Sequence, residues 1–168
     1  MTTHADSDRL PEHLPRLNMA EHAPEAYKAM IQFAAAAKKG VDPVLFELIQ
    51  IRASQINHCA FCLDMHTKDA LAAGESVERI VQLSTWEESK HFYTAKEIAA
   101  IELTEAVTVL TDGFVPDDVY ERAAKHFDAP ELAHLIAAIT LVVFLIGAEE
   151  GVFPSARAMN EPDDMEEE

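Results

Sequence analysis

Apolar residues recur at helical spacing along most of the chain, and an alternation of apolar and polar residues with a period of two is nowhere sustained. Between residues 43 and 56, for example, Leu48 and Ile49 follow Leu45 by three and four residues, so all three share one face of a helix. No internal repeat is visible. The pattern predicts an all-α domain, a helical bundle of about six or seven helices.

Prolines and glycines indicate where these helices begin and end. Pro24 is typical of a helix start and Gly40 of a helix end, while Asn57-His58 and Asp112-Gly113 interrupt the helical pattern. The expected helices cover residues 24–40, 43–56, 59–74, 77–83, 95–110, 116–127 and 129–147.

Capping residues support three of these helix starts. Asp42 precedes a proline and is a favourable N-cap. Thr94 with Glu97, and Asp128 with Glu131, have the spacing of capping boxes, in which each side chain binds the other residue's backbone N–H. We therefore expect helices to begin directly after residues 42, 94 and 128.

The last expected helix contains the longest uncharged run of the chain, residues 132–148. This run reaches about the lower length limit of a membrane span. It contains His134 and has no clean flanks, so we interpret it as a buried helix. A helix that is apolar on nearly every side is either central in its bundle or covered by another subunit. We expect both, and therefore a homo-oligomer.

The length and the ends of the chain indicate one domain. The 168 residues, with a mass of 18.6 kDa, are enough to bury a core without disulfides. Residues 1–14 are polar and are expected to be a flexible segment, and residues 156–168 form an acidic tail. The remaining segment, 15–155, is the expected domain.

Charge and cysteine content exclude several classes of function. Thirteen Lys and Arg against thirty Asp and Glu give a net charge of −17, which disfavours nucleic acids and anionic membranes as partners. Two cysteines do not form the disulfide framework of a small secreted protein. Because the first 15 residues contain no apolar leader segment, we expect a cytoplasmic location.

The candidate chemistry lies in the two cysteines, Cys59 and Cys62, which form a Cys-x-x-Cys pair at an expected helix start. At this spacing both sulfurs lie on one side of the first turn, with Cα atoms about 5 to 5.5 Å apart, a distance that a disulfide tolerates. The free N–H groups of a helix N-terminus stabilise a thiolate. The pair is therefore a candidate redox site.

Two further residues complete the candidate site. His66 follows Cys62 by four residues, one turn along the same face, where it could accept the thiol proton directly or through one water. It is two turns from Cys59, so Cys62 is the better nucleophile and Cys59 the resolving thiol. Glu47 lies in an apolar run of the preceding helix, and a buried carboxylate there needs a partner such as His66.

Other interpretations of these residues remain open at this point. The cysteines could form a structural disulfide, although a bridge within one helical turn is a poor crosslink, or they could be inert and buried. They could also bind zinc with His66 and Glu47, but structural zinc sites usually draw on two separated segments. Glu47 could instead pair with Arg52, His66 could lie at the surface, and His58 fits an ordinary loop residue.

With Glu47, Cys59, Cys62 and His66 in this register, the sequence resembles the AhpD-like alkylhydroperoxidases of the carboxymuconolactone decarboxylase superfamily. The resemblance extends over about residues 14–147 and includes the stretches PRLNMAEHAPEAYKAM, RASQINHCAFCLDMHTKDALAAGES and FVPDDVYERAAKHF. It implies an all-α fold that assembles as a homotrimer or homohexamer, with the site close to subunit contacts.

The resemblance also implies a function. In such a thiol peroxidase Cys62 would be the peroxidatic cysteine and Cys59 the resolving cysteine, with Glu47 and His66 as the proton relay. The substrate would be an organic hydroperoxide, and the reductant a dithiol such as a lipoyl-bearing protein. No cofactor or metal ion is expected. The decarboxylase branch lacks the cysteine pair, so we do not expect lactone decarboxylation.

The sequence departs from that family's pattern at two places. Phe61 stands where the best-known alkylhydroperoxidase has a second histidine, and the segment FLIGAEEGVFP replaces a polar, Asn- and Trp-containing stretch. Two other functions therefore remain as alternatives. One is a dithiol-disulfide redox protein or redox sensor without significant peroxidase activity, and the other is a helical assembly module without catalysis.

Overall fold

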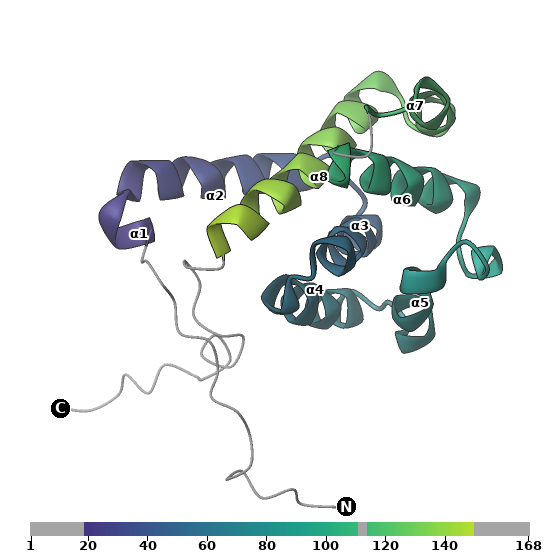
Figure 1. Ribbon diagram of the computed structural model, residues 1–168, viewed down its shortest axis with the longest axis horizontal. Coiled ribbons are helices and arrows are strands. Elements are labelled where there is room, and N and C mark those ends of the chain that lie inside the picture. Colours follow the sequence, from purple (N-terminus) through teal and green to yellow (C-terminus); the bar gives the residue numbers. More distant parts are fainter. Residues whose placement is uncertain (1–18, 111–113, 150–168) are drawn as a thin grey trace, which may run out of the picture.

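The computed structural model describes residues 19–110 and 114–149, and in these residues the regular structure is entirely helical. Figure 1 shows the arrangement of the helices. Eight α-helices and two short 3₁₀ helices follow one another in the order α1 (Met19–His22), α2 (Pro24–Lys38), α3 (Pro43–Asn57), α4 (Ala60–Ala72), α5 (Val77–Gln82), η2 (Leu83–Thr85), η3 (Lys90–Phe92), α6 (Ala95–Thr108), α7 (Asp117–Ala124) and α8 (Ala129–Glu149).

The all-α prediction is confirmed, but its count of six or seven α-helices is one too low in the described residues. The missing helix is α1, which has four residues and is too short to show helical periodicity. The expected helix end at 112–113 and the segments 1–14 and 156–168 lie outside the described residues.

The predicted capping residues define the helix starts. The side chain of Asp42 accepts hydrogen bonds from the backbone N–H groups of Val44 and Leu45, both at 3.0 Å. Both bonds of the capping box form between Thr94 and Glu97. At the start of α8, the backbone N–H groups at positions 128 and 131 donate to each other's side-chain oxygens in the same reciprocal way. These bonds satisfy N–H groups that a helix leaves unpaired at its first turn.

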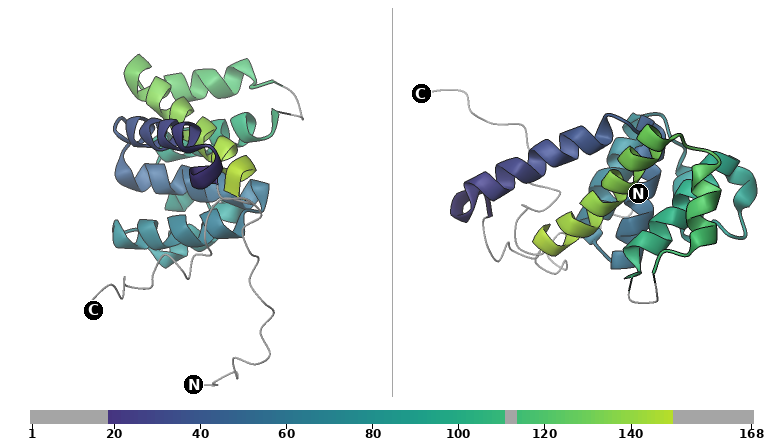
Figure 2. Two further views of the ribbon diagram at one scale, coloured as in Figure 1. Left: turned by 90° about the vertical axis from the view of Figure 1, so that its left-hand side faces the viewer. Right: turned by 90° about the horizontal axis from the view of Figure 1, so that it is seen from above.

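Helix α3 lies at the centre of the described fold (Figures 1 and 2). Helix α4 packs on one side of it, and α6 and α8 pack on it elsewhere. Helix α7 lies against α6, while α2 extends alongside α8 (Figure 2). Because α3 packs against α4, α6 and α8, its sequence is apolar around most of its circumference, and nine of its fifteen residues are buried.

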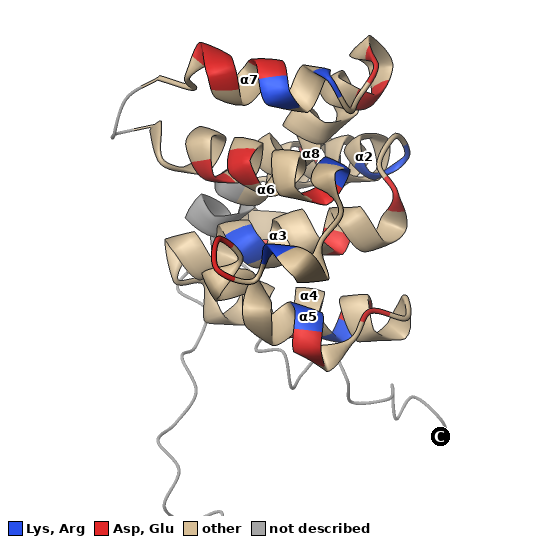
Figure 3. Ribbon diagram, turned by 90° about the vertical axis from the view of Figure 1, so that its right-hand side faces the viewer, with Lys and Arg blue, Asp and Glu red and all other residues tan. Residues whose placement is uncertain are grey.

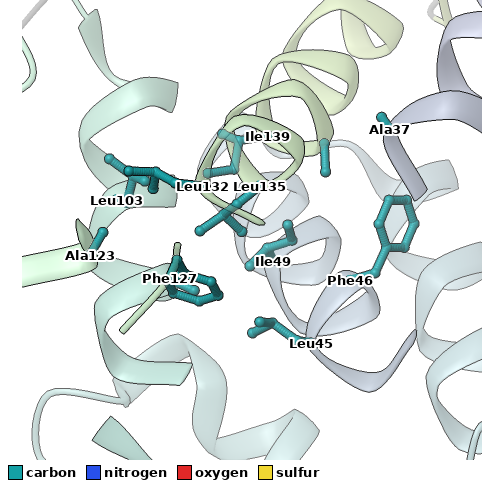
Figure 4. Packing of buried hydrophobic residues seen from close by; sticks show 12 residues of the cluster. Ala37, Leu45, Phe46, Ile49, Leu103, Ala123, Phe127, Leu132, Leu135 and Ile139 are labelled. Carbon is teal, nitrogen blue, oxygen red and sulfur yellow. The ribbon is translucent and has the colours of Figure 1, made fainter. Parts of the chain in front are cut away.

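Two groups of buried side chains form the core, and both include residues of α3. Figure 4 shows the larger one, in which Ile49 packs among side chains of α8, α6 and α7 while Phe46 faces Ala37 of α2. The second group joins α3 to α4, α5 and α6. Its buried members are Leu48, Ile51, Ala70, Ile80, Leu83, Trp86, Tyr93 and Ile101.

The apolar helix α8 packs against α2, α3 and α6. Its residues Leu135, Ala138 and Ile139 are completely buried, which agrees with the prediction of a core helix. In the part of the chain that the structure describes, no helix combines the length and apolarity needed to cross a membrane. The expected homo-oligomer stays a prediction.

The acidic surface contains ion pairs that tie neighbouring helices together. Arg122 of α7 binds Glu102 of α6 and Asp118 of its own helix, both at 2.7 Å. Figure 3 shows acidic and basic positions on α7 and acidic positions on the neighbouring helix α6. Since these side chains are exposed or half-buried, solvent screens their charges and each pair stabilises the fold only weakly.

Candidate active site

The turn between α3 and α4 places the cysteine pair. His58 ends α3 in a left-handed conformation with φ 57°, which a few non-glycine residues such as His and Asn tolerate. This residue reverses the chain, and the backbone N–H of Cys59 then bonds to the carbonyl of Ser54 at 3.1 Å. The predicted break at Asn57-His58 is thus confirmed, and the exposed His58 is a loop residue, as interpreted from the sequence.

Cys59 is the N-cap of α4, one residue before the helix proper. Its sulfur accepts a hydrogen bond from the backbone N–H of Cys62 at 3.3 Å, in the position that a Ser or Asp oxygen usually occupies. Cys62 is the third residue of α4 and is only 1% exposed, whereas Cys59 is half-buried. The sulfur of Cys59 therefore meets the positive end of the helix, an environment that stabilises a thiolate.

His66 and Glu47 meet at the interface of α4 and α3. Nδ1 of His66 lies 2.8 Å from Oε2 of Glu47, and both side chains are buried. Two alternatives raised by the sequence are therefore wrong. His66 is not at the surface, and Arg52 does not pair with Glu47 but binds Glu105 at 2.7 Å.

Glu47 remains ionised in this interface. Burial alone would raise the pKa of its carboxyl group, but the hydrogen bonds from His66 and Lys38 outweigh burial and hold the pKa below its ordinary value. An ionised carboxylate can only accept hydrogen bonds, so Nδ1 of His66 must donate to it. In the neutral imidazole this leaves Nε2 as the acceptor, the state a general base requires.

Lys38 at the end of α2 is a site neighbour that the sequence analysis missed. Its Nζ atom lies 3.0 Å from Oε1 of Glu47 and 4.8 Å from the centre of the Phe46 ring. The edge of the Phe46 ring in turn faces the ring of His66, with ring centres 6.3 Å apart. The short connection between α2 and α3 was the available signal, because it requires the end of one helix to lie beside the start of the next.

Carboxylate, imidazole and thiol groups can also bind a metal ion. Among the described His, Cys, Asp and Glu residues, Glu47, His66 and Asp69 have ligand atoms within 4.8 Å of one another, close enough to share one metal ion. This set does not contain the two cysteines of the zinc alternative. Both carboxylate oxygens of Glu47 already accept hydrogen bonds, from Lys38 and His66, so a metal ion would have to displace these partners. The arrangement therefore fits a proton relay better than a metal centre.

The site thus combines two features from adjacent helices. A dithiol pair lies at the start of α4, and His66, one helical turn beyond Cys62, pairs with Glu47 of α3. Phe61, the second residue of α4, stands half-buried between the two cysteines in sequence and adds an apolar side chain at this point. Such an arrangement can support thiol chemistry assisted by a buried base.

Comparison with known proteins identifies a family and several similar proteins. The model of the carboxymuconolactone decarboxylase family matches residues 24–106, which run from α2 into α6 and include the whole candidate site. The uncharacterised protein YdfG of Bacillus subtilis is 40% identical over 128 residues, which are 76% of this chain and 86% of that protein. The alkyl hydroperoxide reductase AhpD of Rhodopseudomonas palustris is 42% identical over 52 residues, 31% of this chain and 29% of that protein.

A solved structure matches the fold over most of its length. It is the crystal structure of an Agrobacterium tumefaciens protein of unknown function, proposed there to be an antioxidant defence protein AhpD. The match has a TM-score of 0.75 and 35% sequence identity, and it covers 80% of this chain and 92% of that one.

Proposed function

Since the chain belongs to the AhpD-like proteins of the carboxymuconolactone decarboxylase superfamily, we propose that it is a thiol-dependent hydroperoxidase that reduces organic hydroperoxides. The observation that carries this proposal is the buried pair of His66 with Glu47. His66 lies one helical turn beyond the buried Cys62, whose backbone N–H binds the sulfur of Cys59. A nucleophile, a base and an orienting carboxylate in this order are the parts of an activated thiol site.

In the first step, His66 accepts the proton of the Cys62 thiol at Nε2, while Nδ1–H donates to Glu47. The thiolate attacks the terminal oxygen of the hydroperoxide, so an S–O bond forms and the O–O bond breaks. The leaving alkoxide takes the proton from His66 and departs as an alcohol. The peroxide is thereby reduced by two electrons, and Cys62 becomes a sulfenic acid.

In the second step, the sulfur of Cys59 attacks the sulfenic sulfur of Cys62. An S–S bond forms, the S–O bond breaks, and water leaves with the proton that Cys59 loses. The backbone hydrogen bond that Cys59 accepts supports its thiolate form, which is the attacking species. An external dithiol then reduces the disulfide by thiol–disulfide exchange and is itself oxidised.

We further propose a lipoyl-type dithiol as the reductant, because a single reductant molecule can then supply both electrons and close its own disulfide. The half-buried sulfur of Cys59 is the more accessible of the two and is the expected point of attack. A homotrimeric or homohexameric assembly forms part of the same proposal, with the apolar helix α8 as the candidate contact.

Disulfide exchange without peroxide reduction is a second candidate function. The observation that favours it is the position of the half-buried Cys59 at the helix N-terminus, where its sulfur is hydrogen-bonded. Thiol–disulfide exchange needs an accessible thiolate of this kind but needs no buried base. The two functions therefore differ in their dependence on His66 and Glu47.

Steady-state kinetics separate the two functions. We expect the wild type to consume cumene hydroperoxide when dihydrolipoamide is supplied, and Cys62→Ser to lose this activity. The matched control is Ser54→Ala, which changes a buried hydroxyl of α3 that bonds within its own helix. Equal rates for the wild type and Cys62→Ser would contradict the proposal. Fast oxidation of the wild type by a small disulfide, with no consumption of the peroxide, would favour disulfide exchange.

A further inference from the structure

Lys38 contacts the candidate site from a helix that carries none of the predicted catalytic residues. We propose that Lys38 is a positioning residue: its ammonium group keeps Glu47 ionised, and an ionised Glu47 fixes His66 with the hydrogen on Nδ1 and the lone pair on Nε2. This inference rests on the proposed function, since it explains how the base reaches its working form.

The contacts of Lys38 hold its ammonium group beside this carboxylate. Nζ lies 3.0 Å from Oε1 of Glu47, while the other oxygen, Oε2, faces His66. The same ammonium group lies over the Phe46 ring, a favourable cation–π contact. Phe46 and Glu47 are consecutive residues of α3, and Figure 4 shows Phe46 directed toward the end of α2. Lys38 is therefore held by two neighbours on α3.

The burial of Glu47 makes this positive charge necessary. The carboxylate is 3% exposed and has lost most of its hydration, which favours the protonated form. The side chain of Lys38 is 52% exposed, so its ammonium group keeps contact with water while it neutralises the buried charge. One lysine can thus stabilise the carboxylate without itself requiring burial.

The protonation state of Glu47 controls the imidazole. An ionised carboxylate accepts the Nδ1–H of His66, and Nε2 is then free of hydrogen and can accept a proton. A protonated Glu47 would instead donate its O–H to Nδ1, which forces the ring hydrogen onto Nε2 and removes the base. Loss of the Lys38 charge would therefore disable the relay in acid while leaving every other site residue in place.

The other charged groups around Glu47 do not replace Lys38. Asp69 of α4 lies within 4.8 Å of the pair and adds a second negative charge, which opposes ionisation of Glu47. Helices α6 and α8 also pack on α3, but the charged and titratable side chains that the structure describes there face other partners. These other contacts are Arg52–Glu105, Arg79–Glu97, Arg122–Glu102, Lys96–Glu131 and His134 against Gly40. Helix α1 lies at the start of α2 (Figure 1), whereas Lys38 is the last residue of α2.

An NMR titration tests the charge of Glu47 independently of turnover. The side-chain carboxyl ¹³C signal of Glu47, assigned by its loss in Glu47→Gln, is followed as the pH is lowered. We expect Lys38→Met to move its titration midpoint upward by about one pH unit, the size of effect that an adjacent opposite charge produces. Lys38→Gln, a second neutral variant, should behave alike, and Lys38→Arg should match the wild type.

Lys39→Met is the matched control, because it removes the same charge from the next residue, which is exposed. Far-UV circular dichroism verifies that each variant is folded. If the titration midpoint of Glu47 is the same in Lys38→Met and Lys38→Gln as in Lys39→Met, Lys38 does not keep Glu47 ionised and the inference is wrong. This result is independent of peroxidase activity, so it remains decisive even if the proposed function fails.

The pH profile of kcat/KM tests the consequence for the relay. In Lys38→Met the acid limb should move to higher pH, in the same direction as the NMR midpoint, and the rate at neutral pH and above should approach that of the wild type. Lys38→Arg should restore the wild-type profile. A uniform loss of rate at every pH would instead assign Lys38 a structural role and overturn its role in placing the proton.

Discussion

Nδ1 of His66 lies 2.8 Å from Oε2 of Glu47, although the two residues are nineteen positions apart in sequence, on either side of a chain reversal. The relationship depends on the left-handed turn at His58, which folds α4 back along α3. A buried carboxylate and a buried imidazole stabilise one another only when both are placed correctly. The fold thus positions the base of the proposed reaction before any substrate binds.

Glu47→Gln tests the relay directly. The substitution keeps the shape of the side chain but removes the negative charge that orients His66, so kcat/KM should fall by about 10²-fold, as for the loss of general base assistance. Hydroperoxide consumption with dihydrolipoamide measures the effect, and circular dichroism verifies the fold. Glu88→Gln, an exposed residue, is the control and should keep the wild-type rate. Equal rates in the two variants would exclude Glu47 from the reaction.

The lowered pKa of Glu47 predicts how stability depends on pH. Its ordinary value is 4.5, and the folded value is lower, so the folded state favours the ionised form. This contribution is fully present above the ordinary value and is lost as the pH falls through the folded value. Urea unfolding at a series of pH values should therefore show a steeper loss of stability below about pH 4.5 in the wild type than in Glu47→Gln. Parallel curves would contradict the prediction.

The raised pKa of Tyr93 predicts that the protein loses stability at high pH. Burial raises the pKa of its hydroxyl group to about 12, and this hydroxyl donates a hydrogen bond to the carbonyl of Arg79 at 2.6 Å. Because the folded value exceeds the ordinary value of 10.0, stability should be lost between about pH 10 and pH 12. Tyr93→Phe should lose about 1 kcal/mol at neutral pH and show less of this alkaline loss. An unchanged alkaline slope would contradict this account.

Gly40 is predicted to be indispensable for packing of α8. A Cβ atom at this position would meet the ring and the Cβ atom of His134, and these atoms lie too near the backbone to move aside easily. Gly40→Ala should therefore lower the free energy of unfolding by about 1 to 3 kcal/mol, as expected for overpacking. In the double variant with His134→Ala the loss should be partly relieved. If the two substitutions are simply additive, the steric explanation is wrong.

The caps and the cysteine register explain how much the sequence could predict. Asp42, Thr94 and Asp128 act locally, through bonds to backbone groups two or three residues away, so their effect is visible in the sequence. The spacing of Cys62 and His66 likewise follows from the pitch of a single helix. The contact of His66 with Glu47 could be inferred because a buried carboxylate needs a partner, and the family resemblance implied the same pair.

Other features could not be predicted because they depend on how distant segments meet. Nothing distinguishes Lys38 from the other six lysines of the chain until α2 is placed beside α3. Glu105 shows the same limit, since it accepts bonds from Arg52 and from the indole N–H of Trp86 on separate elements. Helix α1 was not predicted for a different reason: its four residues are too few to show a helical repeat of apolar positions.

Mass spectrometry after treatment with one equivalent of cumene hydroperoxide tests the central claim most directly. The account predicts that the wild type loses two hydrogens and that proteolysis recovers Cys59 joined to Cys62. In Cys59→Ser, a dimedone adduct should trap a sulfenic acid on Cys62. Thiols that stay reduced in the wild type, or an adduct found on Cys59 in Cys62→Ser but none on Cys62 in Cys59→Ser, would contradict it.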